Sequence, residues 1–351
     1  MFQRLRPGYA TLLGLGSGLF VATASMGIAP LSIYYSTTGM LKDLLLLGLA
    51  FPLFWLSLIS VEAVRRRFDH PSALIWRYLR RNRNWLMRSA VLSIAVLLLG
   101  RSFMSYKSGL GLYSDYWADP MLADFDVVLF GVDPWRLTHS LIGPFGTMLI
   151  DRVYQLWFFV MMATAGWFCF TRNAKLQLRG LLSYLLSWGL LGCLAATSLA
   201  SVGPAFYHRF VGVDRFGELM ARLKAIDAED YLTALDVMEY LERSYGLDRL
   251  GAGISAMPSL HVAIAVLCFL AVADYARSGL LKVLAWLFAA VITVGSVHLG
   301  WHYASDGLFS IVAVVFFWWA SGRFVDWLEL RDQALAAPAA TPAFNTLPAN
   351  A

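Results

Sequence analysis

Apolar positions along the chain gather into long stretches separated by short polar segments. A membrane-crossing helix needs about 20 mostly apolar residues. Eight stretches approach that length, at 9–30, 41–64, 89–106, 150–170, 180–200, 258–276, 283–301 and 303–322. The pattern therefore predicts an all-α integral membrane protein with about eight transmembrane helices.

Two longer segments of mixed polarity, 107–149 and 201–257, interrupt this pattern. In the second, an acidic start at Asp227 is followed by apolar residues at helical spacing up to Gly246, which predicts an amphipathic helix on the membrane surface. The segment 129–135 predicts a similar short interfacial helix, broken at its proline. We therefore expect short interfacial helices in both of these segments.

Composition agrees with a membrane protein, because 59% of the residues are hydrophobic and 15% are charged. Soluble domains have about 45–50% apolar and about 25% charged residues. This excludes a pair of water-soluble domains and a mostly disordered chain. We predict one membrane domain over 1–333, with a motif-bearing core at about 150–322, and a disordered cytoplasmic tail over 334–351 that is rich in Ala, Pro, Thr and Asn.

The net charge of +5 does not indicate a nucleic-acid partner, because the basic residues lie between apolar stretches and are densest over 65–88. With alternating spans, the basic loops all fall on one side, which the positive-inside rule makes cytoplasmic. Both termini are then cytoplasmic in a multi-pass protein, and the two long segments are extracytoplasmic (the inner membrane, if the cell is bacterial). The expected partners are membrane lipids, and the sequence does not define an oligomeric state.

Polar residues with catalytic chemistry gather in three stretches that the alternation brings to the extracytoplasmic side. The first is Ala256–His261. Pro258 suits the first turn of a helix, and the unpaired backbone N–H groups of that turn favour an anion such as phosphate. Ser259 adds a hydroxyl donor and His261 lies on the same turn. An ordinary helix start with a packed histidine gives the same pattern.

The second stretch is Val297–Asp306. If residues 302–306 are helical, Asp306 can bond one ring nitrogen of His302, fix its tautomer and leave the other nitrogen as a nucleophile. A buried His–Asp pair that only joins helices is an alternative. Another is a metal site on one helix face formed by His298, His302 and Asp306, which Gly300 and the lack of an HExxH motif or cysteine cluster disfavour.

The third stretch, 201–209, contains a Gly-Pro pair that ends a helix, and then Arg209, whose planar guanidinium suits phosphate oxygens. Aromatic residues accompany the second and third stretches. They either shield a reaction intermediate from water or form an interfacial belt, and we favour the belt for most of them: Phe206, Tyr207, Trp301 and Tyr303.

Together these residues resemble the type 2 phosphatidic acid phosphatase superfamily of integral-membrane phosphoryl-transfer enzymes. Its second motif, Pro-Ser-x-His, is matched by Pro258, Ser259 and His261, and the end of its third motif, His-x-x-x-Asp, by His302 and Asp306. The resemblance implies a nucleophile at His302 that becomes phosphorylated and is oriented by Asp306. It further implies a general acid at His261 and a phosphate contact at Ser259, with no metal or other cofactor.

Within the superfamily, the motif sequences are most similar to those of one branch. This branch contains the fungal inositol phosphorylceramide synthases of sphingolipid metabolism (the aureobasidin-resistance type) and their bacterial relatives. The similar segments are Met-Pro-Ser-Leu-His, Gly-Trp-His-Tyr-x-x-Asp, Gly-Pro-x-Phe-Tyr and Leu-Phe-Gly-Val-Asp-Pro. The superfamily's first motif, a lysine seven residues before Arg-Pro, is absent, and Gly295-Ser296 replaces the Ser-Arg of the third motif. Arg209 and His298 are our candidates for the missing phosphate-binding cations.

The leading hypothesis is therefore a membrane-embedded lipid phosphotransferase that moves a phosphorylated headgroup, such as inositol phosphate, between lipids through a phosphohistidine. The alternative is a lipid-phosphate or polyprenyl-diphosphate phosphatase with the same residues. A third hypothesis is a transporter or metal-binding membrane protein without catalytic activity.

Overall fold

The computed structural model describes residues 60–61, 65, 71–229, 231–246 and 253–336. The first predicted span, 9–30, lies outside these residues, as does 41–64 apart from residues 60 and 61. The described part of the chain is helical and contains no strand.

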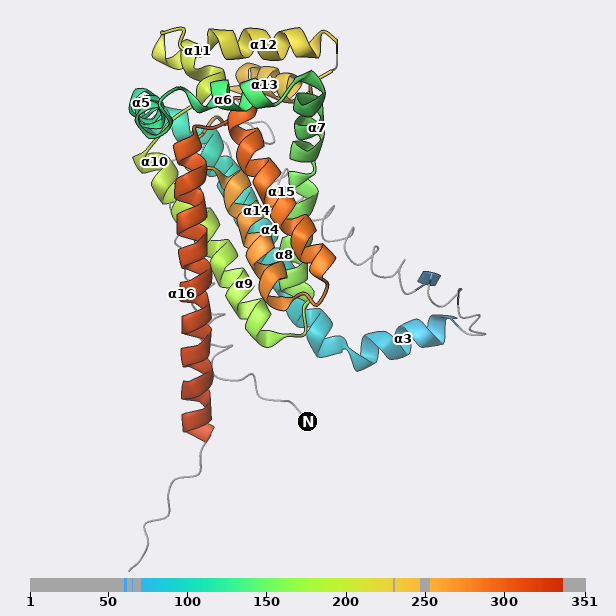
Figure 1. Cartoon of the computed structure of the whole chain (residues 1–351). Coiled ribbons are helices and arrows are strands. Elements are labelled where there is room, and N and C mark those ends of the chain that lie inside the picture. The colour runs from blue at the N-terminus through green and yellow to red at the C-terminus, as the bar shows by residue number, and fades with distance from the viewer. Residues whose placement is uncertain (1–59, 62–64, 66–70, 230, 247–252, 337–351) are drawn as a thin grey trace, which may run out of the picture.

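The described helices form a bundle of apolar helices (Figure 1). Within the described residues, five helical stretches are long and apolar enough to cross a membrane, and the shorter apolar helix α14 (Leu260–Tyr275) lies among them. The five stretches confirm a multi-pass membrane protein and overlap five of the other six predicted spans, whereas the sixth, 258–276, corresponds to α14, which is shorter than these stretches. The five stretches are α4 (Arg83–Tyr113), α7 (Pro144–Gln155) with α8 (Trp157–Phe170), α9 (Ala174–Leu186) with the π-helix η2 (Ser187–Ala195) and α10 (Ala196–Ser198), α15 (Gly279–His298), and α16 (Ala304–Ala336).

Helix α14 occupies the centre of this bundle. It packs against α8, α9, α15 and α16, and residues 262–267 are all buried. The side chain of Ser259 accepts a hydrogen bond from the N–H of Val262 and so caps the start of the helix. The motif-bearing turn before α14 is therefore anchored to a helix that is largely buried in the bundle.

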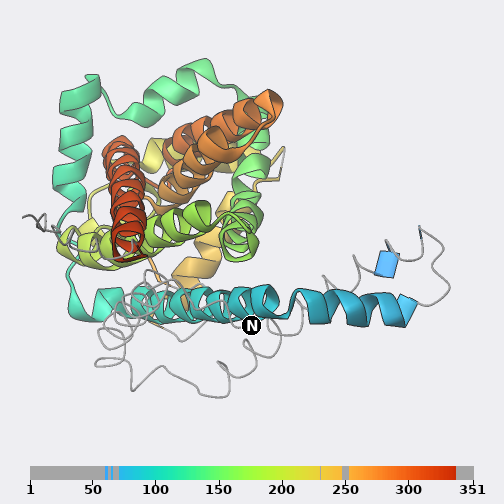
Figure 2. The same cartoon turned by 90° about the horizontal axis from the view of Figure 1, so that it is seen from below.

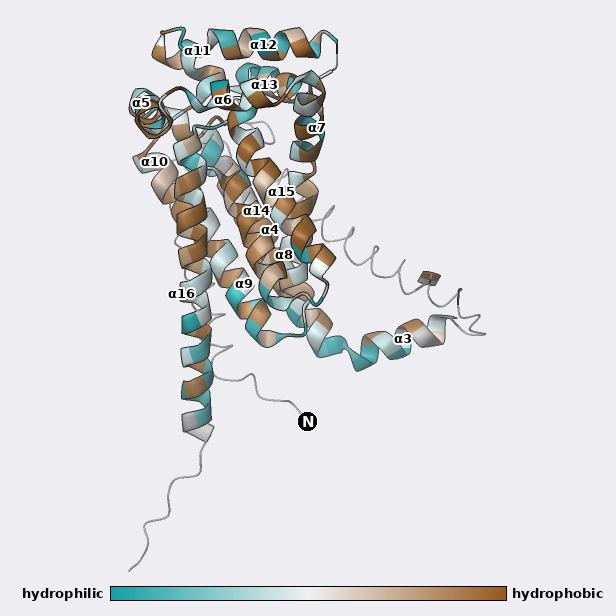
Figure 3. Ribbon diagram, in the orientation of Figure 1, coloured by the Kyte–Doolittle hydropathy of each residue, from teal (hydrophilic) through white to brown (hydrophobic). Residues whose placement is uncertain are grey.

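Short helices cover one end of the bundle, which we call the capped end (Figure 1). Their surfaces mix hydrophilic and hydrophobic residues, whereas the long helices are mainly hydrophobic (Figure 3). Viewed along the bundle, α4 lies along one side, while α5 to α7 run around other sides (Figure 2). Short helix α3 (Pro71–Arg81) leads into α4 at the opposite end. The helices of the capped end are α5 (Asp119–Phe130), α6 (Pro134–Leu141), α11 (Tyr207–Val211), α12 (Gly217–Asp227) and α13 (Thr233–Ser244).

Short helices occur in both predicted segments, but the predicted boundaries were wrong. Asp227 ends α12 instead of opening a helix, and its carboxylate accepts the N–H of Leu232 at 2.7 Å. Helix α13 begins at Thr233 because the carboxylate of Asp151, on α7, accepts the first two N–H groups of that helix at 3.0 and 2.9 Å. Pro134 likewise opens α6 and breaks no helix, because proline needs no N–H partner in a first turn.

The first residues of the predicted tail belong to a helix. Helix α16 continues to Ala336, so residues 334–336 are helical, and residues 337–351 lie outside the described part of the chain.

Replacing Asp151 by alanine should lower the melting temperature of the protein. The change removes both acceptors at the start of α13, and a buried backbone N–H left without a partner costs about 1–3 kcal/mol. The matched control is Glu229→Ala, which removes an exposed carboxylate of the same layer. Thermal unfolding in detergent measures both variants, and equal melting temperatures would contradict the capping role of Asp151.

Candidate active site

A cavity of about 350 Å³ lies where the capped end meets the bundle. Its wall comes from segments far apart in sequence, including α4, α8, η2, α13 and the turns before α14 and α16. His261 and His302, which the sequence predicts to be catalytic, both line it. Their ring centroids are 5.8 Å apart and their planes make an angle of 59°, so the two rings face the same space.

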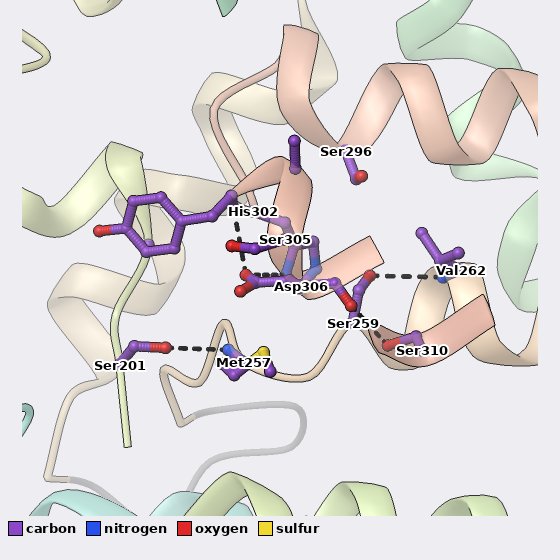
Figure 4. A network of polar contacts seen from close by, with 12 residues as sticks. Ser201, Met257, Ser259, Val262, Ser296, His302, Ser305, Asp306 and Ser310 are labelled. Carbon is purple, nitrogen blue, oxygen red and sulfur yellow. Dashed lines mark hydrogen bonds and ion pairs between the residues drawn. The ribbon is translucent and has the colours of Figure 1, made fainter. Parts of the chain in front are cut away.

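His302 and Asp306 form the predicted buried pair (Figure 4). The ring nitrogen Nδ1 lies 3.3 Å from Oδ2 of Asp306, which also accepts the backbone N–H of Tyr303 at 3.1 Å. An ionised carboxylate only accepts hydrogen bonds, so Nδ1 carries the hydrogen and Nε2 keeps its lone pair. The His302 ring is thereby held as the tautomer that a nucleophile requires.

The chain turns sharply between α15 and α16, and this turn presents His302. Gly300 adopts φ +77°, a conformation that favours glycine, and the N–H of His302 then donates to the carbonyl of Ser296 at 3.0 Å. The break in the helix places His298 and His302 on different elements, so the single helix face required by the metal-site alternative does not form. Within the described residues, no group of three or more His, Cys, Asp or Glu side chains is arranged to hold a metal ion.

Aromatic packing fixes the position of His261. Its ring lies against Tyr154 and Trp157, with centroid distances of 5.0 and 4.3 Å. The indole N–H of Trp157 also donates to the backbone carbonyl of His261 at 2.9 Å. Ser259 is fully buried and caps the helix that carries His261, and a contact between its hydroxyl and phosphate stays a prediction.

Helix α5 holds the turn that carries His302, through Asp126. The buried carboxylate of Asp126 accepts the N–H groups of Ala304 and Ser305 at 2.7 and 2.8 Å, which caps the start of α16. Burial raises the pKa of Asp126, and these hydrogen bonds to Ser305 and Ala304 oppose that shift. Helix α16 therefore begins at Ala304, two residues after His302.

Asp119 is on α5, seven residues before Asp126. It joins the loop at Val202 to the turn before α16. Its buried carboxylate accepts the N–H groups of Val202 and Gly203 at 2.8 and 2.9 Å and the hydroxyl of Tyr303 at 2.7 Å. Burial raises the pKa of Asp119, while the hydrogen bond from Tyr303 opposes that shift. Asp119 and Asp126 lie two helical turns apart on one face of α5.

The Gly-Pro pair after the fifth predicted span permits a close approach of these loops. Gly203 adopts φ +86°, and a Cβ atom there would lie 2.6 Å from the carbonyl oxygen of Trp301. The N–H of Ala205 donates to the carbonyl of Gly300 at 2.9 Å. A residue larger than glycine would therefore displace the turn that carries His302.

The two predicted phosphate-binding cations lie away from the cavity wall. Arg209 is on α11, where its guanidinium donates to the carbonyl of Glu242 at 3.3 Å and lies 5.4 Å from the ring centroid of Phe210. His298 is buried, with Nε2 2.8 Å from the Thr147 hydroxyl and Nδ1 3.0 Å from the Thr138 hydroxyl. The structure does not bring either side chain to His261 and His302.

His298 instead joins α15 to α6. Its ring stacks on His139 with a centroid distance of 3.9 Å, and Nε2 of His139 lies 2.9 Å from the backbone carbonyl of His298. Burial lowers the pKa of His139, which favours the neutral ring in this stack. These contacts fix the end of α15 and so the start of the turn that leads to His302.

The four aromatic residues of the predicted belt lie inside the protein. Phe206, Tyr207 and Tyr303 are at most 4% exposed, and Trp301 packs against them from the turn before α16. Phe206 and Trp301 line the cavity. The belt prediction was wrong for these rings, because the loops that carry them fold onto one another through Asp119 and Gly203.

Lys107 is a cavity residue that the sequence analysis missed. It lies near the end of α4, is half-buried and lines the cavity with His261 and His302. Within the described part of the chain, no carboxylate forms an ion pair with its ammonium group. Its position after an apolar stretch is unremarkable in sequence, and only the fold brings it to the same cavity wall as the two histidines.

The PAP2 superfamily model matches residues 130–320 of the chain. The matched segment is more than half of the chain, and the protein belongs to this superfamily. The PAP2 superfamily comprises phosphoryl-transfer and phosphatase enzymes of membranes, so the resemblance is confirmed at this level. No curated protein and no solved structure gives a significant match.

Replacing Asp126 by asparagine should lower kcat more than it raises KM. Asparagine offers one oxygen acceptor in place of two, so the turn that carries His302 loses part of its support. A small misplacement of a reacting group lowers the rate roughly tenfold to a hundredfold. The control is Asp124→Asn on the same helix, because the Asp124 side chain is 75% exposed. Steady-state kinetics well below the melting temperature measures both, and an unchanged kcat in Asp126→Asn would contradict the positioning role.

Proposed function

We propose that the protein is a lipid phosphotransferase that moves a phosphorylated headgroup between membrane lipids through a phosphohistidine at His302. The observation that carries this proposal is the buried His302–Asp306 pair facing His261 across a mainly apolar cavity. Membership in a family of membrane phosphoryl-transfer enzymes supports it.

In the proposed reaction, Nε2 of His302 attacks the phosphorus of the donor lipid. A P–N bond forms while the P–O bond to the donor lipid breaks, and protonated His261 gives its proton to the departing oxygen. In the second step an acceptor hydroxyl attacks the phosphorus and transfers its proton to His261. The P–N bond breaks, His302 is regenerated, and no electrons are exchanged with another molecule.

Phosphoryl transfer also needs positive charge near the phosphate oxygens. We assign this role to Lys107, in addition to the phosphate contact predicted for Ser259. The ammonium of Lys107 is the basic group that shares the cavity wall with both histidines. Such a cation would replace those that the superfamily motifs contain and this sequence lacks. Arg209 and His298 have other partners, and the proposal therefore assigns them no contact with phosphate.

We propose that the transferred headgroup is of the inositol phosphate type, because the motif sequences resemble those of the inositol phosphorylceramide synthases. The burial of His302, which is 5% exposed, favours transfer to a bound acceptor over transfer to water. Hydrolysis of a lipid phosphate or a polyprenyl diphosphate is the second candidate, and family membership favours it because the superfamily includes phosphatases.

We further propose that the capped end faces the extracytoplasmic side. The short connections at the opposite end of the bundle supply the argument, because the α8–α9 and α14–α15 connections contain basic residues and no acidic ones, whereas the capped end mixes both charges. Positive charge is retained on the cytoplasmic side. The basic residues of these two connections and their adjoining turns are Arg172, Lys175, Arg179, Arg277 and Lys282.

Phosphorus NMR of the reaction products tests the proposed function. Purified protein is given phosphatidylinositol with and without ceramide or diacylglycerol, with a chelator present. We expect a new phospholipid that forms only with the acceptor, and its loss in His302→Ala and His261→Ala but not in His208→Ala, which changes an exposed histidine of the capped end.

Three outcomes would change the assignment. Inorganic phosphate from a phosphomonoester, without a new lipid, would establish the phosphatase. Loss of turnover with the chelator would contradict a reaction without metal. Full activity of both histidine variants would overturn the enzyme assignment.

Lys107→Met should lower kcat/KM roughly tenfold to a hundredfold, because a hydrogen bond to a charged group contributes about 1.5–3 kcal/mol. Methionine keeps the length of the side chain and removes its charge. The control is Lys224→Met, which neutralises an exposed lysine on α12. Initial rates over a range of substrate concentration measure the effect, and a kcat/KM equal to that of the control variant would remove Lys107 from the site.

A further inference from the structure

Helix α3 is set apart from the bundle, at the end opposite the capped end. It runs across the axis of the bundle and extends beyond its outline (Figure 1 and Figure 2). Among the described elements, its main contact is with α4. The membrane-crossing stretch of α4 begins at Arg83, two residues after α3 ends at Arg81. Helix α3 therefore lies along the membrane surface, at the depth of the lipid headgroups.

Side chains of opposite character occupy opposite faces of α3. Three arginines recur at helical spacing on one face and are exposed, whereas the other face carries apolar and aromatic side chains that are half-buried. The three arginines, which we call the basic face of α3, are Arg77, Arg80 and Arg81, and the residues of the other face are Ile75, Tyr78 and Leu79. An amphipathic helix with cations on its polar face is typical of a helix that lies on a membrane.

The charge of the basic face has no carboxylate partner among the residues that the structure describes. The sequence contains no aspartate or glutamate from 71 to 114. The guanidinium of Arg80 lies 5.6 Å from the ring centroid of Trp76, which is 60% exposed. Tryptophan side chains are enriched at the membrane–water interface. The three cations are therefore available to an anion outside the protein.

Contacts at the junction of α3 and α4 hold the direction of α3. The side-chain amide of Asn82 donates to the carbonyl of Tyr78 at 2.9 Å and accepts a hydrogen bond from Arg172 at 2.8 Å. The guanidinium of Arg172 also lies 5.0 Å from the ring centroid of Trp85, whose indole N–H donates to the carbonyl of Phe170 at 3.2 Å. These contacts join the junction to the α8–α9 connection, so the basic face keeps a fixed place at this end of the bundle.

We propose that the basic face of α3 binds the phosphate groups of anionic phospholipids in the leaflet that surrounds this end of the bundle. Planar guanidinium groups pair with phosphate oxygens, and each basic residue held at an anionic surface strengthens binding roughly fivefold. A zwitterionic phospholipid also carries a phosphate, but its own cation opposes the arginines. The basic face therefore selects lipids with a net negative charge.

Thermal unfolding in mixed micelles tests this proposal. Purified full-length protein is placed in a neutral detergent with phosphatidylcholine, which is replaced stepwise by phosphatidylglycerol at constant total lipid. A ligand that binds only the folded protein raises the melting temperature, and the fraction of phosphatidylglycerol at half of the rise reports its affinity. The measurement involves no turnover, so its result is independent of the reaction proposed at His302.

Two triple variants with the same change in net charge are compared. The first neutralises the basic face with Arg77→Gln, Arg80→Gln and Arg81→Gln. The matched control neutralises three exposed cations of the capped end with Arg222→Gln, Lys224→Gln and Arg243→Gln. If the first variant does not fold, Arg80→Gln alone replaces it.

We expect phosphatidylglycerol to raise the melting temperature of the wild-type protein. The fraction at half of the rise should increase at least tenfold in the basic-face variant, or roughly fivefold in Arg80→Gln alone, and stay unchanged in the control. Sodium chloride at about 0.5 M should remove most of the rise, because the Debye length then falls to about 4 Å.

Three results would overturn the proposal. One is a wild-type melting temperature that does not rise with phosphatidylglycerol. Another is a wild-type response in the folded basic-face variant. The third is an equal loss in the control, because the lipid would then respond to the net charge of the whole protein and not to α3.

Discussion

The carboxylate of Asp126 and the two backbone N–H groups at the start of α16 form the contact on which the candidate site depends. A helix start is a group of unpaired donors, and a buried start needs an acceptor. Here the acceptor comes from another helix, almost 180 residues earlier in the chain. Because α16 begins where Asp126 places it, the turn before it delivers His302 to the cavity wall and leaves Asp306 one helical turn away.

The same principle recurs through the capped end. Asp151 determines where α13 begins, and Asp119 joins the loop at Val202 to the hydroxyl of Tyr303. Each of these carboxylates is fully buried and is compensated by two or three donors, which removes most of the cost of burying a charge. The short helices are therefore more than a cover, because they set the positions of the loops around the cavity.

Local spacing explains what the sequence could predict. His302 and Asp306 are only four positions apart, so the turn before α16 and the first turn of α16 bring them together although His302 itself is not helical, and the cap at Ser259 is likewise local. Asp119, Asp126 and Lys107 act on partners far away in the chain, and nothing near them in sequence distinguishes them from other polar residues. The mistaken start at Asp227 has the same origin, because the competing acceptor, Asp151, is on a different helix. The long apolar helices were predictable because the membrane imposes their length on the local sequence.

The division of the cavity wall between two parts of the chain has a consequence for how this kind of protein can diverge. The segment that matches the superfamily, 130–320, contains both histidines and Asp306, but it begins after α4 has ended and at the last residue of α5. Phe103, Met104 and Lys107 thus come from a portion that the superfamily signature does not include. Mutations there can remodel what the cavity accepts while the reacting atoms stay unchanged. A change in the accepted substrate can therefore arise before the matched segment as well as within it, without any change in the motifs.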